Sequence, residues 1–238
     1  MTDASVVGAP RARQVRAERI LDAARELILR WGLKRVTVDD IAEHAGIGKG
    51  TVYLHWKNRE SLFRAVLVRA TLEIVEELET AVRADPETAL PHNLMREVYL
   101  AAASRPLMQA MLVADREMLG SFVDDEVARQ AHERVAAGRE SIEVALEQGI
   151  LRQDLSSEDL KFTMRSVVGG FFVSSSHDTD DLPAPERRGD LLALAVQRAV
   201  ENPDPPAPEV IAKLAAGTLS FLTAFQDAAG AVLEQAYA

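Results

Sequence analysis

Residues 37–63 read TVDDIAEHAGIGKGTVYLHWKNRESLF and hold two short apolar helical patterns separated by one glycine. The apolar positions of the two patterns are Ile41, Ala42, Ala45, Ile47 and Val52. Gly46 stands between them, where the chain needs a left-handed turn that glycine adopts without a Cβ clash. Two short helices can cross steeply when the turn is tight and a small residue such as Ala42 lets the backbones approach. The segment therefore predicts a helix-turn-helix.

Helical periodicity continues over the rest of the chain, and no period-two alternation bounded by turn residues predicts a strand. An upstream apolar stripe at Ile20, Ala24, Leu27 and Trp31 stops at Gly32, which is typical of a helix end. Thr37 and Asn58 have the residue type and position of helix N-caps. We therefore predict an all-α fold with helices near residues 12–31, 38–45, 48–55, 59–85, 91–103, 106–118, 123–148, 157–175, 187–201 and 208–235.

Charge divides the chain into two unequal parts. Residues 1–64 hold 12 Lys and Arg against 8 Asp and Glu, whereas the remainder holds 15 against 29. The whole chain has a net charge of -10, which by itself argues against a polyanionic partner. The net charge of +4 on the first 64 residues reverses that argument for this part. A basic head is joined to a strongly acidic body.

Several classes of site and location are disfavoured by composition. The chain has no cysteine, which excludes disulfides and cysteine-ligated metals. His92, His132 and His177 lie far apart and show no metal-ligand spacing, so we predict no metal site. No nucleophile elbow, phosphate loop or HExxH motif is present, and we expect neither a cofactor nor enzyme activity. The polar, basic N-terminus and the absence of an 18-residue apolar run predict a cytoplasmic protein without a membrane span.

The second helix of the pair combines apolar side chains with basic, hydroxyl and aromatic ones. We expect it to bury Val52 and Trp56 and to expose Lys49, Gly50, Thr51, Tyr53 and His55. Donors of several kinds grouped near one helix N-terminus, where backbone N–H groups also attract phosphate, suit the major groove of DNA. The alternative is that the aromatic residues build core and Lys49 is a solvated lysine. The whole set in this order favours the DNA-binding interpretation.

The segment resembles the tetracycline-repressor (TetR) family of bacterial transcriptional regulators over about residues 14–64. The pattern of that family, a threonine, an "IA…AG" helix, a small-residue turn, a "TxYxxF"-like helix and a basic residue before an apolar pair, is met here. The matching residues are Thr37, Ile41, Ala42, Ala45, Gly46, Thr51, Val52, Tyr53, Trp56, Arg59, Leu62 and Phe63. Trp56 departs from the commoner phenylalanine, a change that alters packing more than contact.

The resemblance implies a domain division and a set of DNA contacts. Residues 1–64 would be a three-helix DNA-binding domain with a basic N-terminal arm, and residues 65–238 a larger helical domain for ligand binding and dimerisation. Lys49 and Gly50 would approach base edges. The other expected contacts, mostly to phosphate, are Arg16, Thr37, Thr51, Tyr53, His55, Lys57 and Arg59. The basic run Arg11, Arg13, Arg16 and Arg19 is interpreted either as reaching adjacent phosphate or the minor groove or as a disordered tail.

The resemblance also implies a four-helix dimer bundle made by the last two long helices of each subunit. The expected interface residues are Phe162, Gly169, Phe172, Val210, Leu214, Phe221 and Phe225, and the alternative is that they face the core of their own subunit. A ligand pocket would lie between the body helices. Its candidate residues are Met95, Tyr99, Met108, Met111, Met118, Phe122, Phe162 and Arg165, although methionines are more often plain core.

These expectations combine into one function with two alternatives. The chain would be a homodimeric repressor that binds a palindromic operator and is released by a small apolar or amphipathic effector. The alternatives are a ligand-independent DNA-binding protein and a helical interaction protein. The second alternative leaves the basic head and the cluster from Lys49 to His55 unexplained.

Overall fold

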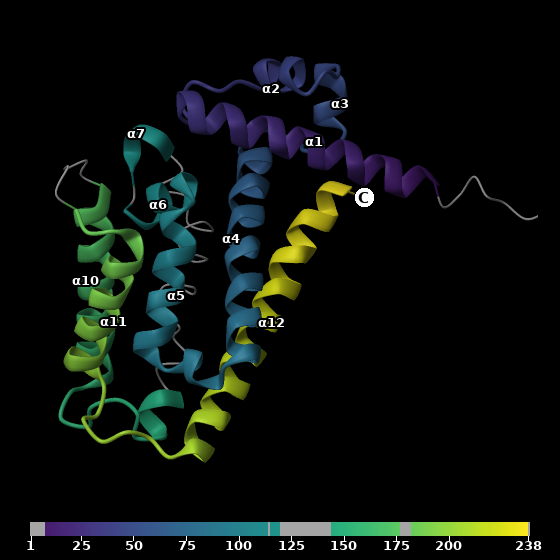
Figure 1. The fold of residues 1–238 in the computed structure, drawn as a ribbon. Coiled ribbons are helices and arrows are strands. Elements are labelled where there is room, and N and C mark those ends of the chain that lie inside the picture. The colour runs from purple at the N-terminus through teal and green to yellow at the C-terminus, as the bar shows by residue number, and fades with distance from the viewer. Residues whose placement is uncertain (1–7, 114, 120–143, 177–181, 238) are drawn as a thin grey trace, which may run out of the picture.

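The computed structural model describes residues 8–113, 115–119, 144–176 and 182–237, and the prediction of an all-α fold is confirmed (Figure 1). The N-terminal helices are α1 (Gly8–Trp31), α2 (Val38–His44), α3 (Lys49–Tyr53) and α4 (Arg59–Ala84). The 3-10 helix η1 (Pro86–Ala89) follows, then α5 (Pro91–Ala103), α6 (Pro106–Leu112), α7 (Arg116–Leu119), α10 (Ser157–Ser176), α11 (Pro185–Val200) and α12 (Pro208–Tyr237). The helix predicted over 123–148 falls largely outside the described residues.

The helix-turn-helix forms from α2 and α3 as predicted. Thr37 caps α2, because its hydroxyl oxygen accepts from the backbone N–H of Asp40 at 3.2 Å while the Asp40 carboxylate accepts from the Thr37 N–H at 2.9 Å. Gly46 has φ +65°, which confirms the left-handed turn. Ile41 and Val52 are buried on the facing sides of the two helices. The turn and the apolar pattern of the sequence therefore position the pair.

Helix α4 belongs to both parts of the molecule. Asn58 caps it in a reciprocal pair with Ser61, and its 26 residues give a length of about 39 Å. Phe63 near its start and Leu78 near its end are both buried in one continuous apolar cluster. The predicted boundary between residues 64 and 65 lies inside this helix. The two parts are therefore joined by a rigid element.

The body helices line up beside α4 (Figure 1). Helix α5 packs against α4 on one side and α11 on the other, and α10 packs on α11. The backbone N–H of His92 at the start of α5 donates to the carboxylate of Glu201 at 2.7 Å, which ties α5 to the end of α11. On the opposite side, α12 runs back along α4 and reaches α1.

Two expectations about helix detail are wrong. The helix predicted over 106–118 is interrupted, because the Asp115 side chain accepts from the backbone N–H of Glu117 at 2.8 Å and of Met118 at 3.1 Å and starts a new helix. Trp31 is 43% exposed instead of completing the apolar stripe. The turn at Gly32, with φ +74°, directs Leu33 into the core in its place.

None of the helices in the described ranges combines the length and the apolar character that a membrane span requires.

Candidate nucleic-acid interface

Helix α3 exposes polar residues at the end of the molecule that lies away from the body (Figure 1). Lys49 and Gly50 are exposed, Tyr53 is 45% exposed, and Thr51 is half-buried. Val52 and Trp56 are buried, as predicted. Thr37 before α2 and Lys57 after α3 are exposed as well. The surface around α3 therefore offers an ammonium group, a phenol and an accessible backbone.

His55 does not lie on this surface. Only 8% of it is exposed, and its ring centroid is 5.4 Å from that of Trp56. The chain keeps turning after α3, since the His55 N–H donates to the carbonyl of Val52 at 3.0 Å, and this turn carries the residue inward. The prediction that His55 is exposed is wrong.

Arg59 is directed into the protein. Its Nε–H donates to the carbonyl of Val36 at 3.0 Å, a terminal N–H donates to the carbonyl of Leu33, and the guanidinium lies 4.4 Å from the centroid of the Phe63 ring. Burial lowers the pKa of this guanidinium. Arg59 therefore joins the connection between α1 and α2 to the start of α4, and this contact places its donors away from the α3 surface.

Lys49 is held by a carboxylate from the neighbouring helix. Its Nζ lies 2.6 Å from Oδ2 of Asp39 in the first turn of α2. This hydrogen bond raises the pKa of the Lys49 ammonium. The side chains of Lys49 and Asp39 are both exposed. In the absence of a competing anion, their hydrogen bond keeps the lysine directed toward Asp39.

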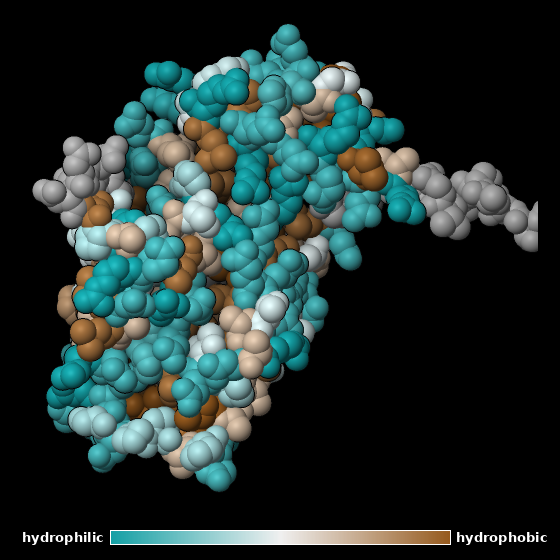
Figure 2. All heavy atoms as spheres, in the orientation of Figure 1, coloured by the Kyte–Doolittle hydropathy of each residue, from teal (hydrophilic) through white to brown (hydrophobic). Residues whose placement is uncertain are grey.

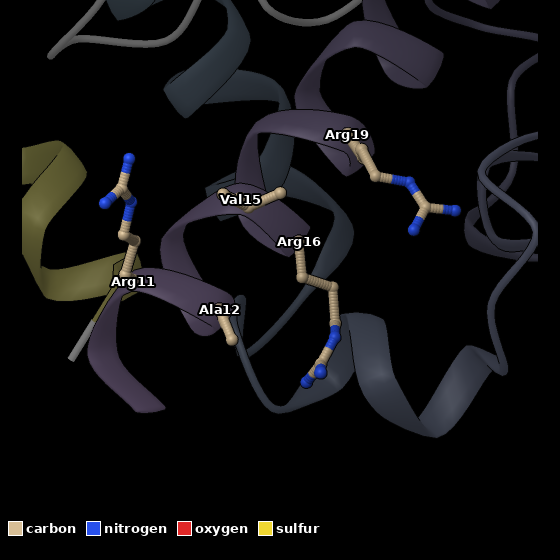
Figure 3. Close-up of a pocket in the computed structure, with 5 residues that line it drawn as sticks. All are labelled: Arg11, Ala12, Val15, Arg16 and Arg19. Atoms are coloured by element: carbon tan, nitrogen blue, oxygen red, sulfur yellow. The ribbon is translucent and has the colours of Figure 1, made fainter. Parts of the chain in front are cut away.

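The basic run before residue 20 is part of α1, so the interpretation as a disordered tail is wrong for residues 11–19. Arg13 and Arg19 bond to backbone carbonyls of the helix-turn-helix. Arg16 is exposed and lines a shallow depression with Arg11, Ala12, Val15 and Arg19. Arg11 lies on the other side of α1 from Arg16, toward α12 (Figure 3). Arg16 is thus placed for contact with an external anion.

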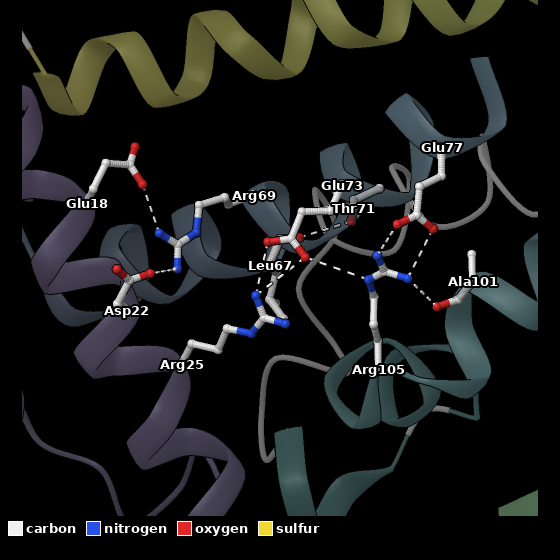
Figure 4. Close-up of polar contacts among 10 residues, drawn as sticks. All are labelled: Glu18, Asp22, Arg25, Leu67, Arg69, Thr71, Glu73, Glu77, Ala101 and Arg105. Atoms are coloured by element: carbon white, nitrogen blue, oxygen red, sulfur yellow. Dashed lines mark hydrogen bonds and ion pairs between the residues drawn. The ribbon is translucent and has the colours of Figure 1, made fainter. Parts of the chain in front are cut away.

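Ion pairs tie α1 to the body (Figure 4). Arg69 of α4 lies 2.8 Å from both the Glu18 and the Asp22 carboxylates of α1. Glu73, one turn further along α4, accepts from Arg25 of α1 at 3.0 Å and lies 3.6 Å from Nε of Arg105, at the start of α6. Arg105 also pairs with Glu77. Sequence reasoning missed these residues, because their helices are separate in the sequence and no spacing within one helix reveals the pairing.

The residues expected to line a ligand pocket separate into two groups. Met95, Tyr99 and Met108 are buried, and Met111 and Met118 are half-buried. The Tyr99 hydroxyl bonds the Ser175 hydroxyl of α10 at 2.7 Å. Phe162, which is 63% exposed, and Arg165 lie on the outer side of α10 and do not join the others. Phe122 lies outside the described residues.

Most residues expected at the dimer interface are covered by their own chain. Phe172 and Leu214 are buried, and Val210, Phe221 and Phe225 are half-buried and packed against the apolar cluster. The reason is that α12 packs on α4, which uses its apolar face within the subunit. Phe162 remains exposed and Gly169 is half-exposed. Part of the α12 stripe thus packs within its own subunit, and the half-buried Val210, Phe221 and Phe225 keep some surface that a partner could cover.

Comparison with known proteins identifies relatives with this architecture. The sequence model described as "Bacterial regulatory proteins, tetR family" matches residues 20–66. The HTH-type transcriptional regulator TtgR of Pseudomonas putida is 30% identical over 152 residues, which are 62% of this chain and 71% of that protein.

Two solved structures share the fold. NalD, the secondary repressor of the MexAB-OprM multidrug efflux pump in Pseudomonas aeruginosa, matches with a TM-score of 0.58 and 18% identity over 79% of this chain and 97% of that chain. SmeT, the repressor of the Stenotrophomonas maltophilia multidrug efflux pump SmeDEF, matches with a TM-score of 0.57 and 23% identity over 81% and 97%.

The pair of Asp39 and Lys49 generates a prediction about duplex DNA. Asp39→Asn frees the ammonium group and removes a negative charge beside the α3 surface, so we expect tighter binding to every duplex, most clearly at low salt. Fluorescence anisotropy with a labelled random duplex measures the effect. Asp204→Asn, which removes one exposed carboxylate from the loop before α12, is the control for net charge. Equal affinities of the two variants would show that Asp39 does not restrain Lys49.

Proposed function

The chain belongs to the tetR family of bacterial regulatory proteins and is a transcriptional regulator, and we propose that it is a homodimeric repressor of a palindromic operator, released by a small apolar or amphipathic effector. The exposed face of α3, with Lys49, Gly50 and Tyr53, is the observation that carries the proposal. Arg16 and Lys57 extend this surface on either side. Together they supply phosphate contacts and at least one side chain for base edges.

A second copy is required because one helix-turn-helix reads too few base pairs. Modules of this kind dimerise on half-sites about 34 to 36 Å apart. The exposed apolar face of α10 and α11 supports a partner there. Phe162 and Val173 are 63% and 47% exposed and lie eleven residues apart on α10, so they share one face.

The same apolar face continues onto the neighbouring helix. Gly169 lies between Phe162 and Val173 and lets a second helix approach. Leu194 of α11 is 49% exposed and belongs to the helix that packs against α10. Figure 2 shows the surface of one face of the molecule coloured by hydropathy, with hydrophobic residues scattered among hydrophilic ones. Large apolar side chains exposed on adjacent helices favour a self-complementary interface with a second copy.

The effector proposal is supported by the interior of the body. Met95 and Tyr99 of α5 and Met108 of α6 are buried, and methionine adapts to apolar ligands of irregular shape. The Ser175 hydroxyl donates to the carbonyl of Phe171 at 2.7 Å, so the Tyr99 hydroxyl donates to Ser175. An amphipathic effector could compete for this hydroxyl pair while its apolar part contacts the methionines.

Transmission from effector to DNA is supported by Glu73. One carboxylate on α4 holds Arg25 of the DNA-binding part and lies near Arg105 at the start of α6. A shift of α6 therefore changes the forces on α1 as well. Such a shift alters DNA affinity only if the effector binds the two arrangements with different affinity.

The first test concerns DNA. Fragments selected from a random pool by the purified protein should share an inverted repeat. Lys49→Ala should relax preference at one base position by about 1 to 3 kcal/mol, whereas Tyr53→Ala should weaken all duplexes about equally. Sequencing of the selected pool and titration of single-base variants measure both effects. A pool without any shared sequence would contradict the proposal.

The second test concerns the dimer. Phe162→Glu places a charge on the exposed face of α10, and we expect the protein to become monomeric and to lose affinity for the full operator. Analytical ultracentrifugation gives the mass. Leu29→Glu on α1 is the matched control, because Leu29 is 37% exposed, lies on a different helix from α10 and is 13 residues from Arg16. A Phe162→Glu protein that sediments as a dimer would exclude this face as the interface.

The third test concerns coupling. A compound that raises the unfolding temperature of the protein is titrated by calorimetry with and without operator. The operator should weaken the affinity for the compound by the same factor by which the compound weakens the affinity for the operator, because coupling is reciprocal. Glu73→Gln should bring this factor closer to one. Glu76→Gln, a neighbouring exposed carboxylate on α4, should leave it unchanged. If the Glu73→Gln variant kept the coupling factor of the wild-type protein, the Glu73 carboxylate would not transmit the effect of the compound to the DNA-binding part.

A further inference from the structure

We propose that Arg13 and Arg19 are positioning residues that set the direction of α3, and that neither contacts DNA phosphate. The inference rests on the proposed DNA-binding function and concerns how the reading helix is held. Both residues belong to the basic run whose charge suggests phosphate contacts. Their guanidinium groups instead bond backbone carbonyls inside the DNA-binding part.

The two carbonyls occupy equivalent places. A terminal N–H of Arg19 donates to the carbonyl of Ala45, the C-cap of α2, at 2.6 Å. A terminal N–H of Arg13 donates to the carbonyl of Leu54, the C-cap of α3, at 3.0 Å. Carbonyls at helix C-termini lack intrahelical partners and carry the negative end of the helix dipole. A guanidinium is well suited to both, because it supplies donors and positive charge together.

The spacing of these bonds fixes a direction. Arg13 and Arg19 are six residues apart on one rigid helix, which separates their Cα atoms by about 9 Å along its axis. Ala45 precedes α3 at the turn, and Leu54 follows α3 directly. A single bond would leave α3 able to pivot about it. Two bonds from the same helix hold the end of α2, just before the turn into α3, and the end of α3.

The turn at Gly46 and the packing on α2 place α3, but the helix itself is short. It contains five residues, of which only Val52 is buried. A helix of this length is not stable alone, and apolar burial stabilises without specifying orientation. The pair of Lys49 and Asp39 is exposed and therefore weakened by salt. The two arginine bonds are directional contacts to backbone carbonyls, one part-buried at Ala45 and one exposed at Leu54.

Arg16 provides a matched control within the same helix. It has the same chemistry, lies between the two positioning residues in sequence, and is exposed, as Arg19 is. The described residues offer it no carbonyl of this kind, and it lines the depressions on α1 that also involve Leu54 and His55. Its donors remain available to phosphate.

The experiment compares Arg13→Met, Arg19→Met and Arg16→Met, which retain an apolar stem and remove only the guanidinium. Affinity for the selected operator and for a random duplex of equal length is measured over a range of salt concentrations. Arg16→Met should reduce the slope of log K against log salt on random duplex by about 0.9, as expected for one lost phosphate contact. Arg13→Met and Arg19→Met should keep that slope and lose at least about tenfold in the ratio of operator to random affinity.

Folding and rescue complete the experiment. Circular dichroism and the unfolding temperature identify any variant that fails to fold, and the two positions test the inference independently. Arg13→Lys and Arg19→Lys retain a donor for the carbonyl and should restore much of the operator preference. The inference would be overturned if Arg13→Met and Arg19→Met reduced the salt slope as Arg16→Met does. It would also be overturned if both variants kept the operator preference of the wild-type protein. Absence of operator preference in the wild-type protein would instead contradict the proposed function.

Discussion

The rest of the structure depends on one constraint, which is that α4 is buried both in the DNA-binding part and in the body. Its first turns pack Leu62 and Phe63 into the DNA-binding part, and its later turns pack Ile74 and Leu78 into the body, within one apolar cluster. Two sets of ion pairs, one on each of two successive turns of α4, then fix α1 along the same helix. The helix-turn-helix therefore cannot change its orientation to the body without a change at α4.

The sequence predicts the helices well because their signals are local. Caps at Thr37 and Asn58, the glycine at position 46 and the apolar periodicity depend on residues within one or two turns of each other. The failures concern what covers a given side chain. His55 and Arg59 follow a polar, exposed helix in sequence, but the turn after α3 and the neighbouring carbonyls draw them inward. No spacing in the sequence encodes those neighbours.

The same limit applies to the apolar stripe of α12. Helices α10 and α12 both carry an apolar stripe, and an apolar stripe specifies only that something must cover it. In the structure α4 covers α12, so Leu214 and Leu222 become core. The outer side of α10 keeps Phe162 and Val173 exposed, beside Leu194 of α11. The partner of each stripe depends on the path of the chain between them, which periodicity does not describe.

Internal use of arginines also limits what a charge count can say about DNA binding. The basic head has 12 Lys and Arg, but several of its arginines bond carbonyls or a carboxylate within the chain. Other basic groups of the head are exposed, among them Arg11, Arg16 and Lys57, whereas the ammonium of Lys49 is shared with Asp39. In a dimer of the proposed kind, two linked heads would make affinity depend on engaging two half-sites together. Affinity that depends on two half-sites is sensitive to their spacing, and a small shift carried by α4 is then sufficient to change it.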